Sequence, residues 1–185
     1  MILFRCFPWD RGAAEGARGG AHWFPRLLQG AGRHDNPMLY GCLYASQDPL
    51  SPVVERLARF RGRPLTPDKL VSSGLPVALA ALELADEAEL VDLDDPAALL
   101  QEELRPSQVA TNDRSVTQAQ AGGLFERHPE AAGLRWWSTF ESLWANVTLF
   151  DRAEAALAVA DVHALDVGDD VVGEAAEFLG LALST

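Results

Sequence analysis

The 185-residue sequence predicts an α+β fold in which short strands and helices are mixed. Hydrophobic residues make up 48% of the chain, which is enough to bury a sizeable core. Runs of alternating or β-branched residues, typical of strands, lie between stretches with apolar residues at helical spacing. The two kinds of element do not alternate regularly, as they do in a parallel α/β sheet, so the α+β class is favoured.

The N-terminal part of the chain predicts two strands and a long connection between them. Met1–Phe7 is apolar apart from Arg5 and is ended by Pro8, so we expect a first strand. Asp10–Gly20 mixes glycine and alanine with charged residues, which indicates a flexible loop. A second strand, Leu39–Ser46, follows a turn-prone His-Asp-Asn-Pro run.

An amphipathic helix is expected after the second strand. Its apolar residues recur at the spacing of one helical face, namely Leu50, Val53, Val54, Leu57 and Phe60. Pro52 is compatible with the first turn of such a helix. Glu55 falls opposite the apolar face, where it either pairs with Arg59 in water or lines a cleft.

The remainder of the chain predicts five further strands and three helices. The strands are expected at Pro76–Leu84, Glu89–Leu93, Leu134–Phe140, Asn146–Phe150 and Val162–Val167. The helices are expected at Pro96–Leu104, Val116–Arg127 and Val171–Leu183. Asp113 or Ser115 is placed to cap the second of these helices. No change of composition marks a linker, so we expect a single domain over residues 1–185.

The composition argues against several classes of protein. Acidic residues outnumber basic ones by 27 to 15, and a net charge of −12 argues against direct nucleic-acid binding. No apolar stretch approaches the roughly 20 residues that a membrane-spanning helix needs. Without a signal peptide, and with only Cys6 and Cys42 as cysteines, we expect a cytoplasmic protein with no disulfide framework and no metal site.

Arginine is unevenly distributed. Fourteen of the fifteen basic residues are arginines, and nine of them lie between residues 5 and 63. A GC-rich genome would produce the same preference for arginine over lysine. Guanidinium groups also fit phosphate oxygens, so a basic first third in an acidic protein is compatible with a small phosphorylated ligand.

Several segments offer candidate functional residues, although no P-loop, zinc-protease or nucleophile-elbow motif is present. In Gly30–Pro37, glycines precede Arg33, a pattern that suits an ordinary loop or a phosphate site. Ser138 follows two tryptophans in a predicted strand, where a serine usually bonds to backbone. Trp136 and Trp137 point to opposite strand faces, so we expect one in the core and the other at a pocket wall.

Taken together, these segments resemble the RES domain family, bacterial toxins named for an arginine, a glutamate and a serine. Six segments match the family pattern in order: Met1–Arg5, Gly32–Pro37, Leu43–Tyr44 with Glu55 eleven residues further on, Thr117–Ala119, Gly133–Ser138 and Asn146–Phe150. The resemblance covers about residues 1–150, so 151–185 is expected to add a C-terminal strand and helix.

The resemblance implies an ADP-ribosyltransferase-like fold, with a split mixed β-sheet surrounded by helices. It also implies an NAD-consuming enzyme, a glycohydrolase or phosphorylase that cleaves the bond between nicotinamide and ribose. NAD is then the substrate, inorganic phosphate a candidate co-substrate, and neither a cofactor nor a metal is implied. The implied protein partner is an Xre-like antitoxin.

The resemblance assigns catalytic roles to three residues. Glu55 would stabilise the positive charge of an oxocarbenium-like transition state. Arg33 would hold the substrate beside it, and Ser138 would bond to the nicotinamide amide or support Glu55. Ser115 competes with Ser138 for the role of the functional serine.

The resemblance also assigns residues to NAD binding. Arg5 and Arg33 would clamp the diphosphate, because two guanidinium groups can bind it bidentately. Tyr44, with Trp136 or Trp137, would stack on the nicotinamide ring. Ser115 belongs to the same expected site.

Two departures from the family pattern keep other functions open. His34 stands where the family has tryptophan, and Trp137 stands where it has proline before the serine. The alternatives are ADP-ribosyl transfer to a macromolecular target and a non-catalytic NAD-binding or interaction module. The closing helix, with Ala175, Ala176 and Gly180, would serve either the core or a homodimer face.

Overall fold

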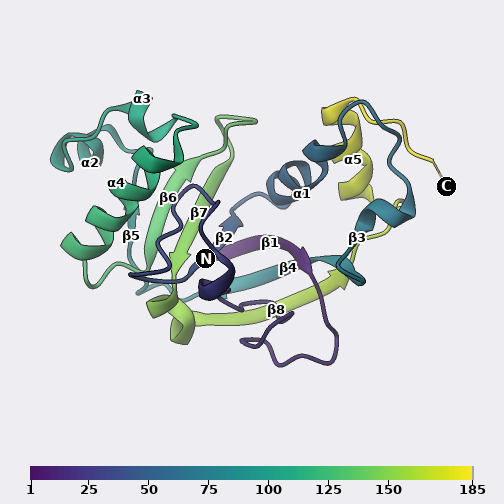
Figure 1. Ribbon diagram of the computed structural model, residues 1–185, viewed down its shortest axis with the longest axis horizontal. Coiled ribbons are helices and arrows are strands. Elements are labelled where there is room, and N and C mark those ends of the chain that lie inside the picture. The colour runs from purple at the N-terminus through teal and green to yellow at the C-terminus, as the bar shows by residue number, and fades with distance from the viewer. Residues whose placement is uncertain (185) are drawn as a thin grey trace.

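The structure, a computed structural model that describes residues 1–184, is an α+β fold built on an eight-stranded mixed sheet (Figure 1). Its strands are β1 (Ile2–Pro8), β2 (Cys42–Ser46), β3 (Val71–Ser72), β4 (Leu75–Leu84), β5 (Leu90–Asp92), β6 (Gly133–Trp137), β7 (Ala145–Phe150) and β8 (Leu157–Ala164). The order is β3-β4-β1-β2-β7-β6-β5, and β8 also pairs with β4. β5 and β6 run parallel, whereas the other pairs are antiparallel.

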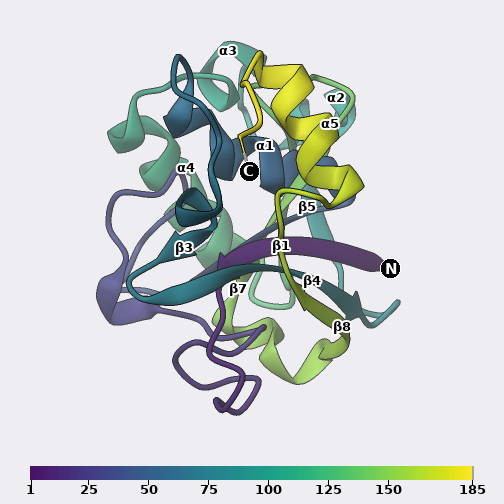
Figure 2. The same ribbon diagram turned by 90° about the vertical axis from the view of Figure 1, so that its right-hand side faces the viewer.

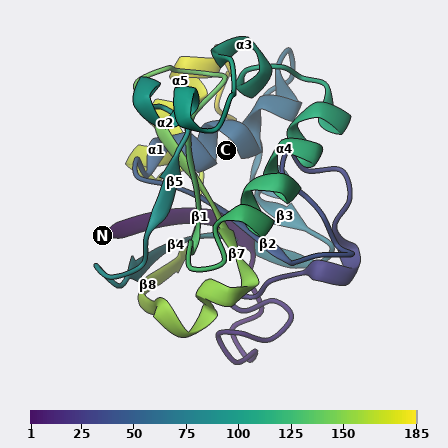
Figure 3. The same cartoon turned by 90° about the vertical axis from the view of Figure 1, so that its left-hand side faces the viewer.

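The helices form two groups on the sheet. They are α1 (Leu50–Leu57), α2 (Pro96–Gln101), α3 (Pro106–Val109), α4 (Arg114–Arg127) and α5 (Asp170–Leu179). α1 and α5 pack together above β1 and β4, whereas α2, α3 and α4 lie beside β5, β6 and β7 (Figures 1 and 3). None of these helices, within residues 1–184, is long and apolar enough to cross a membrane.

The sheet is split between β1 and β2. These two strands share a single residue pair, Phe4 with Ser46. By contrast, β1 pairs with β4 along its whole length, and all five residues of β2 pair with β7. The α+β class and the split mixed sheet are therefore confirmed, and the split sets the position of the first cavity described below.

Three apolar clusters hold the two halves of the sheet and their helices. Val53, Val54 and Leu57 of α1 pack against α5 and the sheet, which is the contact that the helical spacing predicts. A second cluster lies on the opposite face of β1, around the buried Leu3 and Phe7. The third joins α4 to β6 and β7. Apolar burial of this extent is the main stabilising term of such a fold.

The predicted strand near the C-terminus begins earlier than expected. It runs over Leu157–Ala164, not Val162–Val167. A bulge in its pairing with β4, between Ala81 and Leu82, places Val159 and Val162 against the same core although they are three residues apart. Because the bulge breaks the two-residue period, the alternation of apolar residues does not predict the first half of this strand.

The closing helix ends at Leu179, not at Leu183. Gly180 stops it with a left-handed backbone, φ 67°, which glycine adopts without steric cost. Ala175 and Ala176 are fully buried in the cluster with α1. These small residues therefore serve the core and do not present a homodimer face.

Candidate functional site

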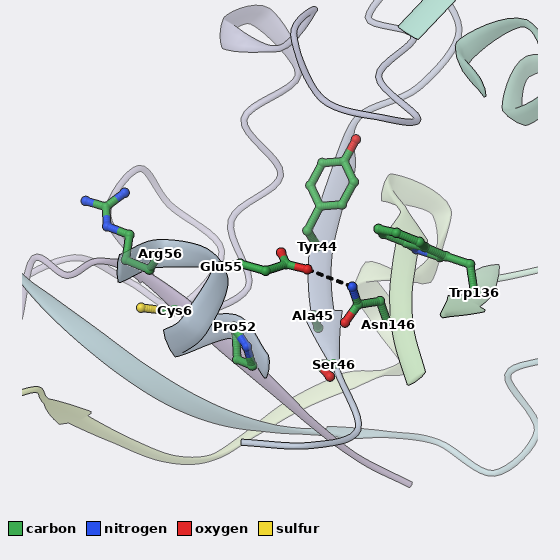
Figure 4. A pocket seen from close by; sticks show the side chains of 9 residues that line it. All are labelled: Cys6, Tyr44, Ala45, Ser46, Pro52, Glu55, Arg56, Trp136 and Asn146. Atoms are coloured by element: carbon green, nitrogen blue, oxygen red, sulfur yellow. Dashed lines mark hydrogen bonds between the residues drawn. The ribbon is translucent and has the colours of Figure 1, made fainter. Parts of the chain in front are cut away.

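A cavity of about 200 Å³ lies where β1 and β2 diverge. Its lining residues come from β1, β2, α1, β6 and β7, and they are Cys6, Tyr44, Ala45, Ser46, Pro52, Glu55, Arg56, Trp136 and Asn146 (Figure 4). α1 leaves the end of β2 and forms one wall, while Trp136 and Asn146 form the opposite one. The split in the sheet thus leaves room that continuous strand pairing would close. We call this space the Glu55 cavity.

Glu55 is held at the centre of the cavity by a hydrogen-bonded chain. Its Oε1 accepts a hydrogen bond from Nδ2 of Asn146 at 2.8 Å, drawn in Figure 4. The buried Ser51 donates from Oγ to Oδ1 of the same asparagine at 3.0 Å. Ser51 and Glu55 are four residues apart on α1 and therefore share one helix face. Asn146 is bonded through both ends of its amide, which fixes the direction in which it donates to Glu55.

The surroundings of Glu55 raise the pKa of its carboxyl group. Removal of water by nearby protein atoms is the largest cause, and the Asn146 hydrogen bond and the Arg33 charge act in the opposite direction. The residue itself is exposed, because its carboxyl group faces the open cavity (Figure 4). A carboxyl group with a raised pKa in a cavity is a frequent feature of active sites.

Tyr44 is fixed by the loop before β2. Its hydroxyl donates to Oδ1 of Asp35 at 2.7 Å and accepts from the backbone N–H of His34 at 2.9 Å. The other carboxylate oxygen of Asp35 accepts from the N–H groups of Gly30 and Gly32. A Cβ atom on Gly32 would lie 2.5 Å from both Asp35 Oδ1 and Tyr44 Oη, so this close approach needs glycine. The tyrosine ring is therefore held rigidly at the cavity wall.

The Thr117-Gln118 pair in the first half of α4 holds the same loop from the other side. Thr117 donates to the carbonyl of Arg33 at 2.6 Å, and Nε2 of Gln118 donates to the carbonyl of Gly32 at 2.8 Å. The role of this motif is therefore to position the loop, because neither side chain lines the cavity.

Arg33 lies beside the cavity without lining it. Its Nη1 donates to the carbonyls of Val109 and Thr111, both at 2.8 Å, and the side chain is 6% exposed. Its guanidinium carbon is 4.9 Å from the centre of the Trp136 ring. It is close enough to Glu55 for the two charges to influence each other's pKa. Arg33 thus acts on the cavity through its charge and through the position of Trp136.

His34 points into the core. Its Nδ1 is 2.8 Å from Oγ1 of Thr148, and the ring meets Trp136 edge to face with centroids 5.3 Å apart. Trp136 donates to the same Thr148 hydroxyl at 3.1 Å. Burial, with Arg33 nearby, lowers the pKa of His34 to about 3, so the ring is neutral at ordinary pH. This residue supports Trp136 and does not contact the cavity.

The cation among the residues that line the cavity is Arg56. It follows Glu55 on α1, and its Nε atom is buried with no hydrogen-bond partner among residues 1–184. No carboxylate in that part of the chain forms a salt bridge with it. Cys6 lies close by, and burial raises the pKa of its thiol to about 12, so the thiol stays protonated. Arg56 is therefore a cation at the wall of the cavity that pairs with no carboxylate in the described part of the chain.

Arg5 is not at this site, contrary to the role implied by the resemblance. Strand residues alternate between faces, and the neighbouring Cys6 is the one that lines the Glu55 cavity. Arg5 points to the opposite face of β1, where its Nη1 donates to the carbonyl of Ala21 at 2.6 Å. It cannot form a clamp with Arg33 in this arrangement.

Three further candidates lie outside the cavity. Ser138 is 2% exposed, and its Oγ accepts from the N–H of Phe140 in the turn after β6, so it does not reach Glu55. Ser115 is exposed and donates to Asp113, the cap of α4. Trp137 lines a separate apolar groove beside α2. Of the two tryptophans, Trp136 is both buried and at the wall of the Glu55 cavity.

Sequence reasoning missed three residues of the site. Asn146 was visible only as the first residue of an Asn-x-x-Leu strand, and its approach to Glu55 is a contact across 91 positions. Ser51 and Glu55 show the four-residue spacing of a shared helix face, which is a weak signal that exists in most helices. Arg56 belongs to the arginine-rich first third but has no motif of its own.

Comparison with known proteins gives two findings. The RES domain family model matches residues 2–170. Among solved structures, a chain of the crystal structure of the M. tuberculosis MbcT–MbcA toxin–antitoxin complex has the same fold, with a TM-score of 0.60. That likeness covers 97% of this chain and 87% of the other at 17% sequence identity. No curated protein matches the chain.

Proposed function

Because the chain belongs to the RES domain family, we propose that it is the toxin of a toxin–antitoxin pair and that it consumes NAD at the Glu55 cavity. The observation that carries this proposal is the carboxyl group of Glu55, oriented by Asn146 and flanked by the rings of Tyr44 and Trp136. The solved toxin–antitoxin complex with the same fold supports the assignment to this class.

The proposed reaction breaks the bond between the ribose C1′ atom and the nicotinamide nitrogen. The bonding pair leaves with that nitrogen and neutralises the positive ring. An oxygen of water or inorganic phosphate then bonds to C1′, and its proton passes to solvent. As the C–N bond breaks, the positive charge moves from the nicotinamide ring to the ribose. The ionised Glu55, placed beside the ribose, would stabilise the developing oxocarbenium ion more than the bound substrate and would so favour C–N cleavage. Tyr44 and Trp136 would stack on the nicotinamide ring.

The size and charge of the cavity indicate how the dinucleotide would lie. Sites for drug-sized ligands span roughly 300–1,000 Å³, whereas this cavity has about 200 Å³. It therefore suits the nicotinamide riboside end, with the diphosphate at its mouth. Since Arg5 lies on the other face of β1, we assign the diphosphate to Arg56, with Arg33 adding positive charge from behind Trp136.

Incubation of the purified chain with NAD tests the reaction. We expect release of nicotinamide, measured by liquid chromatography, and loss of release in Glu55→Gln. Glu174→Gln is the matched control, because Glu174 is exposed on α5 with no side-chain bond among residues 1–184. Mass spectrometry with and without phosphate then identifies the acceptor as water, phosphate or a macromolecule. NAD binding without nicotinamide release would instead show a non-catalytic binding module.

We also propose that a helical, Xre-like antitoxin covers the Glu55 cavity. This proposal is supported by the family match and by the complex in which the related structure was solved. If it is correct, the product of an adjacent gene co-purifies with the chain and blocks nicotinamide release. A neighbouring product that binds without affecting release would contradict the proposal that it covers the cavity.

A further inference from the structure

A second cavity of about 350 Å³ lies on the face of β1 opposite the Glu55 cavity. It is enclosed by β1, by Ser73 in the turn between β3 and β4, by Leu75 at the start of β4, and by the loop that connects β1 to β2. In Figure 2 this loop, drawn in purple, hangs below the sheet, on the side away from α1 and α5. We call this space the loop cavity.

The loop over this cavity folds into compact hydrogen-bonded turns between Asp10 and Gly20. The N–H of Asp10 donates to the carbonyl of Gly19 at 3.0 Å, and three further backbone hydrogen bonds tie the turns within Asp10–Gly20. Gly19 and Gly20 are buried. A Cβ atom on Gly20 would lie 2.2 Å from the carbonyl oxygens of Ala14 and Glu15, so the turns are tightly packed. The wall of the cavity is therefore built in advance of any ligand.

The polar groups of the loop cavity favour an anion. Arg5 and Arg18 both line it, and neither forms a salt bridge within residues 1–184. The carboxylate that lines it, that of Asp10, accepts from the N–H of Gly12 in its own turn. Arg5 donates one hydrogen bond, to the carbonyl of Ala21. Its other N–H groups have no protein partner in the described chain. Burial lowers the pKa of Arg5 to about 10, so it remains charged at neutral pH.

The apolar groups of the loop cavity favour a flat ring. Phe7, Trp23 and Pro25 line it, and the Arg5 guanidinium lies 5.1 Å from the centre of the Phe7 ring. Keeping a half-buried cation such as Arg5 without an acidic partner is costly, and a bound anion would offset that cost. The volume falls in the range of roughly 300–1,000 Å³ that small-molecule sites occupy.

We propose that the loop cavity is a second ligand site, independent of the Glu55 cavity, for a small molecule that joins an aromatic ring to a carboxylate or phosphate group. Arg5 and Arg18 bind the anionic group from opposite sides, one from the strand and one from the loop. Trp23 packs against the ring. The site does not depend on the reaction proposed for Glu55.

Amide chemical shifts of the full chain test this proposal, with benzoate and phenyl phosphate as probes and benzyl alcohol as the uncharged comparison. We expect at least one of the two anions to move the Gly19 and Gly20 resonances. The anion that binds more tightly identifies carboxylate or phosphate as the preferred group. Arg18→Ala should weaken binding roughly tenfold or more, as loss of a charge-assisted hydrogen bond does. Arg18 is exposed and unbonded within residues 1–184, so this variant should fold.

Arg63→Ala is the matched control, because Arg63 is also exposed and lies outside the loop cavity. Arg5→Gln provides a second variant from the strand side of the site and should lose binding as well. Equal binding of benzyl alcohol, shifts centred on Asn146, absence of any shift, or unchanged affinity in Arg18→Ala would each overturn the proposal.

Discussion

Asn146 of β7 donates from Nδ2 to Oε1 of Glu55 on α1 at 2.8 Å, while its Oδ1 accepts from Ser51 one helical turn before Glu55. This arrangement ties the helix wall of the cavity to the sheet wall. It also makes the ionisation of Glu55 sensitive to the chemistry of residue 146, because the amide is the one hydrogen-bond partner of that carboxylate among residues 1–184.

Replacing Asn146 with aspartate should move the acid limb of the pH–rate profile. A carboxylate next to Glu55 disfavours the charged form, so the pKa of Glu55 rises further above its ordinary value. If turnover needs the ionised form, activity is lost at a higher pH as the pH falls, by about one pH unit or more. Initial rates of nicotinamide release across pH measure the shift. Gln101→Glu likewise replaces an amide with a carboxylate, at an exposed position of α2. It should leave the acid limb of the pH–rate profile at its wild-type pH.

Ser51→Ala should destabilise the fold. The substitution leaves the buried Oδ1 of Asn146 without its partner, which costs about 1–3 kcal/mol of unfolding free energy. Urea denaturation measures this loss. Ser107→Ala removes an exposed hydroxyl on α3 and should stay within about 0.5 kcal/mol of the wild type. Equal stability of both variants would show that the Ser51 contact contributes nothing.

Gly32→Ala should disturb the loop that fixes Tyr44. The added Cβ lies 2.5 Å from Asp35 Oδ1 and from Tyr44 Oη, so their hydrogen bond has to break or the backbone has to shift. We expect a loss of about 1–3 kcal/mol, as for other overpacked sites, together with weaker NAD binding. Thermal and chemical unfolding measure the first effect, and calorimetric titration the second.

The matched control for this prediction is Gly173→Ala. A Cβ at Gly173 meets no atom within 4 Å, and the residue lies within α5. Alanine should therefore raise the unfolding free energy by about 0.5–1 kcal/mol through helix propensity. Destabilisation of equal size in the two variants would contradict the specific role of Gly32.

His34 should make the protein less stable in acid. Its pKa is about 3 in the folded state, against 6.5 for an ordinary histidine, so the unfolded chain binds the proton more tightly. Stability contributed by the neutral ring is complete above pH 6.5 and falls by about 1.4 kcal/mol per pH unit as the pH drops toward 3. Urea denaturation between pH 7 and 5 measures this slope.

Variants and spectra separate His34 from the other histidines. His34→Gln should lose this contribution to the slope, whereas His163→Gln, at an exposed position of β8, should keep it. In the wild-type protein, the ring proton resonances of His34 should stay unchanged between pH 7 and 5. A His34 resonance that titrates near pH 6.5 would contradict the buried neutral ring.

Much of the fold could be predicted because it rests on local patterns. Helical spacing predicts α1 and turns Glu55 away from the apolar face. Of the two cap candidates for α4, Asp113 and Ser115, the structure shows Asp113 as the cap. The two-residue β3 and the single turn of α3 were not predicted, because such short elements carry too little periodic signal. The true start of β8 was not predicted either, because a bulge breaks the alternation of its side chains.

The composition of the cavity depended on contacts that no local pattern encodes. Period-two alternation separates Arg5 from Cys6, but only the packing of α1 decides which face of β1 meets the Glu55 cavity. The same holds for Trp136 and Trp137. Alternation places their side chains on opposite faces of the strand, but it does not say which of the two faces the Glu55 cavity. Ser138 looked functional by its motif, yet a turn after β6 uses its hydroxyl.

The sequence by itself determined the α+β class, most of the elements and the residue types available for chemistry, because periodicity, capping and turn signals act over a few neighbouring residues. Only the tertiary structure decided that β1 and β2 diverge after a single pair, that Asn146 reaches Glu55, and that Arg5 faces a different cavity. These outcomes depend on side-chain packing between segments as far as 91 positions apart, and the free energy of such contacts is set by the whole fold.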